Sequence, residues 1–188
     1  MALVKPAIKY YAHSGRDASK ADWQELRTHL FATADLASRL AAPLGLASAA
    51  HAAGLFHDLG KYTAEFQTRL TGADERVDHS TAGAIAMLGD LAAGADKSIA
   101  ELIAYCIAGH HAGLPDRQNE TSACLERRRE TKLPALDTVW KTELVTQVSG
   151  LVPNFARNYP SREALCFGLS VMGRMIFSCL VDADFKDT

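Results

Sequence analysis

Histidine and aspartate residues are the side chains in this sequence whose types and spacing could carry out chemistry together. The most informative is the adjacent pair His57-Asp58, in the run from Leu55 to Lys61. An imidazole and a carboxylate next to each other can point at the same divalent metal ion. Further candidate ligands are spread along the chain: His29, His79, His110, His111, Asp182 and Asp184. Together these side chains are enough to bind two metal ions.

The donor atoms of this set indicate a catalytic rather than a structural metal site. Imidazole nitrogen and carboxylate oxygen suit zinc, iron, manganese, nickel and cobalt, and no cysteine stands beside the histidines as a sulfur-rich structural zinc site would require. Two metal ions ~3.5–4 Å apart, bridged by a carboxylate, can stabilise both the attacking and the leaving oxygen of a phosphodiester displacement. Asp58 is the natural bridge in such a site.

Taken singly, each histidine also has an ordinary structural explanation. A lone histidine on an apolar helix face, such as His29, is more often a hydrogen-bonded core residue. His79 alone could cap a helix, and the doublet His110-His111 alone could be a solvated loop. The functional interpretation rests on their combination, and His51, which has no matching motif, is assigned no role.

Helical periodicity predicts the elements that must position these residues. We expect a first helix that opens near Ser19 and Asp22 with a capping-box-like start and ends at Pro43 and Gly45. Further helices are expected at about 48–57, 63–70, from 79 or 80, 98–108, 124–132 and 136–148, and from Ser161 as N-cap to the last residues. Gly60 would end the second helix in a left-handed conformation.

These elements place the candidate ligands mostly at helix ends. His29 falls on the inward stripe of the first helix, His57-Asp58 at a helix end, His79 at a helix start and His110-His111 at a helix-to-loop junction. The last helix should bury one stripe: Leu165, Leu169, Met172, Ile176 and Leu180. Asp182 and Asp184 flank that stripe almost symmetrically at ~100° per residue, so periodicity does not choose between them.

Length and composition predict a single, all-α domain. The chain has 188 residues and a hydrophobic fraction of 48%, with many alanines and leucines, the residues that form helices at least cost. We expect a compact helical bundle over residues 1–188, with few strands. A net charge of −2 does not indicate a nucleic-acid binder, although Arg127, Arg128 and Arg129 with Lys132 form a local basic segment that is either a solvated helix face or a phosphate contact.

The sequence also predicts where in the cell the protein is found. We expect no apolar run that approaches the ~20 residues needed to span a bilayer, and no leader with a small-residue cleavage site. We therefore expect a cytoplasmic protein.

At this point the residues carry a resemblance to a known family. The order of a histidine, an HD pair and a distant aspartate resembles the HD superfamily of metal-dependent phosphohydrolases. More closely, the chain resembles the HD nuclease domain of the CRISPR-associated helicase-nuclease of type I systems. The matching phrases, in family order, are Tyr11-Ala12-His13-Ser14, Leu26-Arg27-Thr28-His29-Leu30, His57-Asp58-Leu59-Gly60-Lys61 with Phe66-Gln67, Asp78-His79-Ser80, Gly109-His110-His111 and Leu180-Val181-Asp182-Ala183-Asp184.

The resemblance implies a role for each of these residues. It implies that one metal ion is held by His29, His57, Asp58 and Asp184, and the other by Asp58, His79, His110 and His111. Asp184 is preferred over Asp182 because Ala183-Asp184-Phe185 matches the family's Ala-Asp-aromatic ending. His57 and Asp58 would be catalytic together with Lys61, which would neutralise charge developing on the phosphate. Lys61 could instead serve only as helix C-terminal charge.

Residues at the start of the chain are expected at the margin of this site. His13 would support its edge. Tyr11 and Ser14 would either line the substrate entrance or serve a structural role.

The resemblance further implies an endonuclease that cleaves single-stranded DNA in CRISPR type I antiviral defence. Whether it also has exonuclease activity is left open. The cofactors would be one or two divalent transition-metal ions, manganese, iron, nickel or cobalt, with magnesium as a further candidate. The partners would be single-stranded DNA, a CRISPR-associated helicase and an RNA-guided surveillance complex. No helicase phosphate-binding motif G-x-x-x-x-G-K-[ST] occurs here, so the chain is either a stand-alone subunit or a domain of a longer helicase-nuclease.

Two alternatives from other functional classes remain. An HD phosphohydrolase acting on nucleotides or cyclic dinucleotides would use the same ligands in a tighter pocket. A non-catalytic binding module would use metal only to stabilise a helical scaffold.

Overall fold

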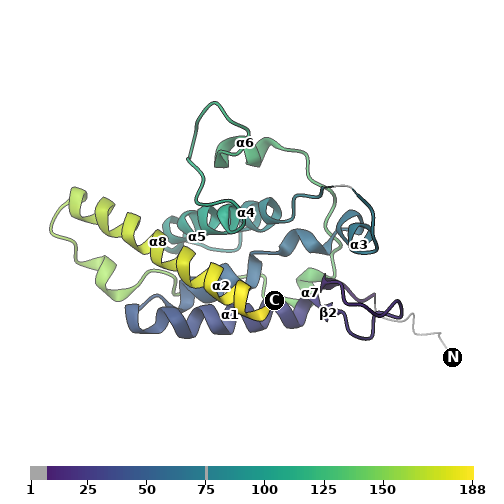
Figure 1. Ribbon diagram of the computed structural model, residues 1–188. Helices are drawn as coiled ribbons and strands as arrows, with labels where there is room; N and C mark the ends of the chain where they lie inside the picture. Colours follow the sequence, from purple (N-terminus) through teal and green to yellow (C-terminus); the bar gives the residue numbers. More distant parts are fainter. Residues whose placement is uncertain (1–7, 75) are drawn as a thin grey trace.

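Helices dominate the part of the chain that this computed structural model describes, residues 8–74 and 76–188, as the sequence predicts (Figure 1). The α-helices are α1 (Leu26–Ala41), α2 (Ala47–Phe56), α3 (Ala64–Leu70), α4 (Ser80–Leu88), α5 (Asp96–Gly109), α6 (Leu125–Glu130), α7 (Trp140–Glu143) and α8 (Arg162–Asp187). Three 3-10 helices, η1 (Ala42–Leu44), η2 (Leu59–Tyr62) and η3 (Asn154–Arg157), and a short antiparallel pair, β1 (Tyr11–His13) and β2 (Gln24–Glu25), complete the described elements.

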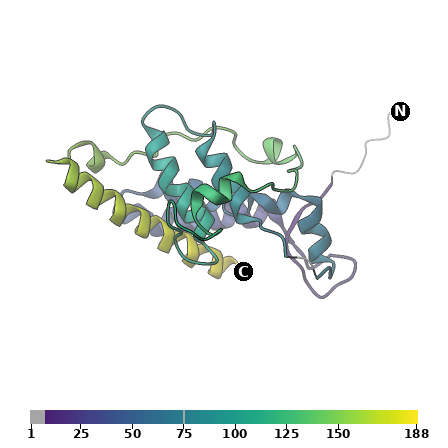
Figure 2. The ribbon, with the colours of Figure 1, turned by 90° about the horizontal axis from the view of Figure 1, so that it is seen from above.

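The core is formed where α1, α2, α5 and α8 meet. Helix α1 packs against α2 and α8, and α5 packs against α4, α2 and α8, so that α8 lies across the other helices (Figures 1 and 2). Leu30, Ile107 and Ile176 are completely buried in this core. A Cβ on Gly54 of α2 would lie 2.6 Å from the Cα of Ala34 in α1, so the close approach of these two helices requires glycine.

The first helix begins later than the sequence predicts. Gln24 and Glu25 pair with β1, and α1 starts at Leu26. The predicted capping box is wrong, because the Asp22 carboxylate instead accepts hydrogen bonds from the backbone N–H groups of Arg16 and Asp17. Local polar side chains therefore close a loop here rather than start a helix.

The segment from 136 to 148 is also less helical than predicted, since it forms only the single turn α7, Trp140–Glu143. Contacts with other parts of the molecule, rather than helical hydrogen bonds, hold the rest of this segment in place. Tyr62 Oη donates to the Glu143 carboxylate at 2.7 Å, and Leu144 is buried in the core.

Gly60 serves a different purpose from the predicted left-handed helix end. It lies within η2, and a Cβ at this position would come within 2.5 Å of the His79 Cα. The Gly60 N–H donates to the His79 carbonyl at 3.0 Å. The absence of a side chain thus lets the start of α4 approach the segment that follows His57-Asp58.

The last helix begins as predicted, with Ser161 Oγ accepting a hydrogen bond from the Ala164 N–H at 3.2 Å. Its inner stripe is buried at Met172, Ile176 and Leu180, whereas Leu165 and Leu169 are only partly buried.

The expectation that no apolar stretch is long enough to span a membrane is wrong for α8, which contains an 18-residue window with a mean hydropathy of 1.9. Core helices of soluble proteins pass the same test of length and composition. On its own, therefore, this helix does not assign the protein to a membrane.

Candidate metal centre

Asp58 stands at the centre of two groups of candidate ligands. The inner group consists of Asp58, His29, His57 and Asp184, and the outer group of Asp58, His79, His110 and His111. Within each group, one ligand atom from every residue lies within 4.8 Å of the others. The structure thus brings together all seven residues that the sequence predicts as metal ligands, in the two predicted groups.

The two carboxylate oxygens of Asp58 face different groups. Oδ2 lies 3.4 Å from His29 Nε2 and 3.3 Å from His57 Nε2. Oδ1 lies 3.5 Å from His79 Nε2 and 3.4 Å from His110 Nε2. This arrangement allows one carboxylate to bridge two cations.

The histidines present Nε2 to the cluster because their other ring nitrogen, Nδ1, is held elsewhere. The acceptors are Gly54 O for His57 at 2.7 Å, Ile107 O for His110 at 2.7 Å, Val77 O for His79 at 3.3 Å and Asp187 Oδ2 for His29 at 2.7 Å. A donor hydrogen on Nδ1 leaves a lone pair on Nε2, which is the tautomer a metal ligand needs. Asp187 was not singled out from the sequence, although its position three residues after Asp184 places it on the same face of α8.

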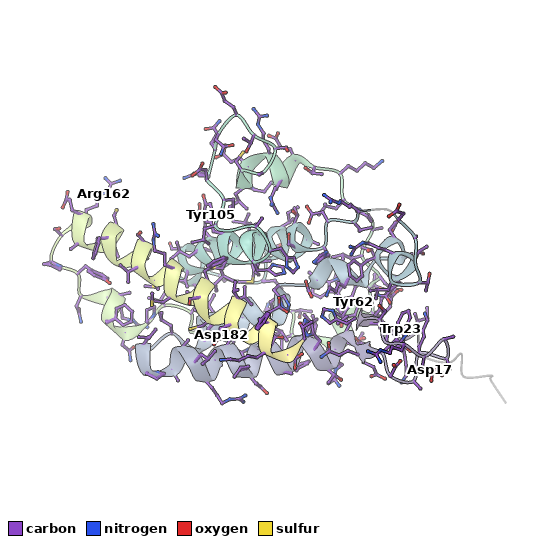
Figure 3. The ribbon with its side chains drawn as sticks, viewed as in Figure 1. Asp17, Trp23, Tyr62, Tyr105, Arg162 and Asp182 are labelled. Atoms are coloured by element: carbon purple, nitrogen blue, oxygen red, sulfur yellow. The ribbon has the colours of Figure 1, made fainter. Side chains whose placement is uncertain are left out.

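Asp184, and not Asp182, belongs to the cluster. Asp184 Oδ1 lies 3.4 Å from His29 Nε2 and 3.3 Å from His57 Nε2. Asp182 instead pairs with Lys186 at 2.7 Å, near the end of α8 that lies opposite Arg162 (Figure 3). Packing of α8 on α1 selects between two aspartates that the periodicity leaves equivalent.

Lys61 is buried beside Asp58. Its ammonium lies 2.6 Å from Asp58 Oδ2 and donates to the Ala12 carbonyl at 3.1 Å. Its side chain is only 4% exposed, so the main electrostatic partner of its charge is the Asp58 carboxylate. The same contact ties β1 to the cluster.

The outer group is more open than the inner one. His29 and His57 are completely buried, whereas His111 is exposed and the side chain of His79 is 16% exposed. His79 Nε2 and His111 Nε2 lie 2.8 Å apart. The side chain of Asp184 in the inner group is also 16% exposed, so solvent is most accessible at His111 without being confined to the outer group.

Asp78 positions His79 at the start of α4. Its carboxylate accepts hydrogen bonds from the backbone N–H groups of Ser80 and Thr81 and from the Thr81 hydroxyl, which satisfies the first turn of the helix.

The chemistry of the donor set fits a metal ion. Among the described residues, Asp58 Oδ1 and His110 Nε2 are buried polar atoms with no hydrogen-bond partner. Buried polar atoms are normally hydrogen-bonded, and a shared cation between these two would satisfy both. A set of histidine nitrogens and carboxylate oxygens suits a divalent transition metal.

The electrostatics of the cluster favour a positive charge between the carboxylates. Burial lowers the pKa of His57, but the charges of Asp58 and Asp184 outweigh it and raise the pKa to about 10. Burial by itself would raise the pKa of Asp58. The positive charges of His57 and Lys61 have a larger, opposite effect, so the pKa of Asp58 lies well below its usual range. Because a ligand imidazole must be neutral, metal binding would release the His57 proton.

Two further histidines lie outside both groups. The His13 ring is 5.1 Å from the His29 ring in an edge-to-face arrangement, at the border of the inner group. His51 Nε2 lies 3.6 Å from Asp35 Oδ1, away from the cluster.

The comparisons with known proteins agree with this geometry at the level of the family. The model of the HD domain matches residues 26–138, more than half of the chain and a span that includes every residue of the two groups except Asp184. No curated protein matches the chain. HD domains are metal-dependent hydrolases of the phosphohydrolase type, and the cluster described above is of the kind such an enzyme uses. The chain therefore belongs to the HD-domain family.

Proposed function

We propose that this protein is a metal-dependent nuclease that cleaves single-stranded DNA in the cytoplasm as part of CRISPR type I antiviral defence. The observation that carries the proposal is that Asp58 offers one oxygen to each of two ligand groups. This is the two-metal arrangement implied by the resemblance to the HD nuclease domain of type I helicase-nucleases. The residues of the two groups would hold the ions, with manganese, iron, nickel, cobalt and magnesium as candidates.

The reaction is hydrolysis of a phosphodiester bond. A water oxygen forms a bond to phosphorus, the bond from phosphorus to the 3′-oxygen breaks, and the leaving oxygen takes up a proton. Divalent ions at such a site activate water and stabilise charge on the phosphate oxygens. The chain's own contribution is to hold the Nε2 atoms in place, to keep Asp58 ionised and to supply the buried positive charge of Lys61.

A cationic surface next to the outer group supports a polymeric, negatively charged substrate. Phe66 packs against the His79 ring with their centroids 5.1 Å apart, and the Arg69 guanidinium lies 5.9 Å from the Phe66 ring. Arg69 and Arg76 line an open hollow of about 750 Å³ that also includes Ser14 and Asp74. We propose that this hollow receives backbone phosphates on one side of the cleavage position, since arginine suits phosphate recognition.

The partners follow from the same resemblance. A CRISPR-associated helicase, fused or separate, would deliver the single strand after an RNA-guided surveillance complex has opened the target. Residues 1–188 would act as one nuclease domain, and sequence-independent contacts to the backbone would suffice for binding.

Cleavage of circular single-stranded DNA tests the proposal, because a circle offers no free end to a nucleotide pocket. Metal-stripped protein is supplied separately with manganese, iron, nickel, cobalt, zinc and magnesium. We expect at least one metal to restore cutting, and Asp58→Ala to abolish it, while Asp182→Ala, a change of the same type outside the cluster, retains it. Hydrolysis of nucleotides or cyclic dinucleotides without any cutting of the circle would instead assign the enzyme to nucleotide metabolism.

The hollow is tested with Arg69→Ala combined with Arg76→Ala. We expect a higher KM for DNA, a weaker dependence of binding on salt and an unchanged kcat for a minimal phosphodiester, since these residues would neutralise backbone phosphates without touching the reacting atoms. Arg39→Ala combined with Arg162→Ala is the control, because it removes two arginines from other parts of the molecule. Equal KM values for the two double variants would exclude the hollow from the substrate path.

A further inference from the structure

His29 is held differently from the other anchored histidines of the cluster. His57 and His110 bond through Nδ1 to the carbonyls of Gly54 and Ile107, three residues earlier in their own helices. His29 Nδ1 instead meets a carboxylate from the far end of the chain, Asp187 Oδ2, at 2.7 Å.

The difference follows from where each histidine lies in its helix. His57 and His110 directly follow α2 and α5, where the last carbonyls have no intrahelical partner and can accept a side-chain hydrogen bond. His29 lies in the first turns of α1, where the carbonyls are engaged by the helix and only N–H groups are free. A partner for His29 Nδ1 must therefore come from another element, and α8 supplies it.

We propose that Asp187 is a positioning residue that fixes the tautomer and ring orientation of His29 for metal binding. Its carboxylate keeps the hydrogen on Nδ1, so that Nε2 faces Asp58 and Asp184. A carboxylate behind a ligand imidazole also raises the basicity of that ligand. The last turn of α8 thus contributes to the inner group twice, through Asp184 and through the orientation of His29.

Gln24 holds Asp187 in turn. Its Nε2 donates to Asp187 Oδ2 at 2.8 Å and to the Asp187 carbonyl at 3.2 Å. These bonds offer a competing explanation, in which Asp187 only anchors the end of α8 to β2. A useful experiment must separate orientation of His29 from anchoring of the helix.

The experiment compares Asp187→Ala and Asp187→Asn with Gln24→Ala, which removes the anchor but leaves the bond to His29. Asp182→Ala is the matched control on the same helix, since its carboxylate pairs with Lys186 outside the cluster. Two measurements are made: cobalt affinity and coordination by visible absorption, and the Nδ1 and Nε2 chemical shifts of His29 by nitrogen NMR of zinc-loaded protein. Neither requires a substrate, so the result does not depend on the proposed nuclease activity.

We expect Asp187→Ala to weaken binding of the cobalt ion of the inner group by roughly 10- to 100-fold and to shift the His29 nitrogens. Asp187→Asn keeps an acceptor and should lose less, while Gln24→Ala and Asp182→Ala should retain wild-type affinity and shifts. Equal losses in Gln24→Ala and Asp187→Ala with unchanged His29 shifts would overturn the proposal in favour of anchoring. Wild-type values in Asp187→Ala, or in Asp187→Leu should the alanine variant fail to fold, would overturn it as well.

Discussion

The inner and outer groups share Asp58 but are built in different ways. The inner group takes its other ligands from α1, from the end of α2 and from α8, which is far from both in the sequence, and His29 and His57 are completely buried. The outer group takes its ligands from the start of α4 and the end of α5, and His111 is exposed. Buried ligands held by packed helices are preorganised, whereas exposed ligands lose more freedom when they bind. We therefore expect the inner group to bind an ion tightly and the outer group to exchange it.

Asp58→Ala should have the largest effect, because it removes the residue common to both groups. Metal content should fall below one ion per chain, and the proposed phosphodiester hydrolysis should fall by more than the roughly 10- to 100-fold typical of changes behind the ligands. Elemental analysis and a rate assay measure the two quantities. Circular dichroism must accompany them, because the substitution also leaves Lys61 buried without its partner. Two ions retained per folded chain would refute the shared-carboxylate arrangement.

His29→Ala and His111→Ala test the difference between the groups directly. We expect His29→Ala to weaken the tighter of two cobalt-binding steps and His111→Ala to weaken only the looser one, because each residue belongs to one group. Isothermal titration separates the steps. The comparison between the groups would fail if both variants weakened the same step.

Metal removal should destabilise the protein mainly through the inner group. A ligand at 100 times its Kd stabilises the folded state by about 2.7 kcal/mol, and the inner group connects α1, α2 and α8. We expect the melting temperature to rise steeply over the first equivalent of metal and only slightly over the second. A rise that occurs mostly with the second equivalent would reverse the assignment of tight and loose sites.

Acid should destabilise the metal-stripped protein through His13, at the border of the inner group. Burial, together with the nearby charge of Lys61, lowers the pKa of His13 from 6.5 to about 4. Between these values the unfolded chain binds a proton that the folded chain does not, so stability falls as the pH drops through this window and levels off below it.

Because His13 is half-buried, its contribution should not exceed ~2 kcal/mol after solvent screening. Urea unfolding at pH 6.5 and 4.5 measures the loss, and His13→Gln should reduce it. An identical loss in the variant would assign the acid sensitivity to other groups.

Asp182→Ala should have the smallest effect. It removes an exposed ion pair with Lys186 one helical turn away, which is worth roughly 0.3–0.5 kcal/mol. Metal stoichiometry and hydrolysis should stay at wild-type values. A loss of metal in this variant would mean that α8 can present either aspartate to the inner group, and the distinction between Asp182 and Asp184 would have to be abandoned.

Particular residues show how far the sequence predicts the site. The histidines and Asp58 are identified by residue type and by the order of their phrases along the chain, and their positions at helix ends follow from local breakers such as Gly109 and Gly113. Asp187 is not identified, because nothing near it in the sequence announces a bond to His29, 158 residues away. Gly60 is recognised as a special position, but for the wrong reason, since the contact that requires glycine comes from His79.

The sequence by itself determines the helical class, the apolar face of the last helix at Met172, Ile176 and Leu180, and the donor atoms available to a metal ion. These properties depend on residue type and on spacing of a few residues, which hydrogen bonding along one helix and the hydrophobic effect convert into local structure. Only the tertiary structure decides that Asp184 faces the cluster, that Asp58 divides its oxygens between two groups and that Asp187 stands behind His29. Each of these depends on the rotation and depth at which one helix packs on another, which is set by the close packing of the whole core.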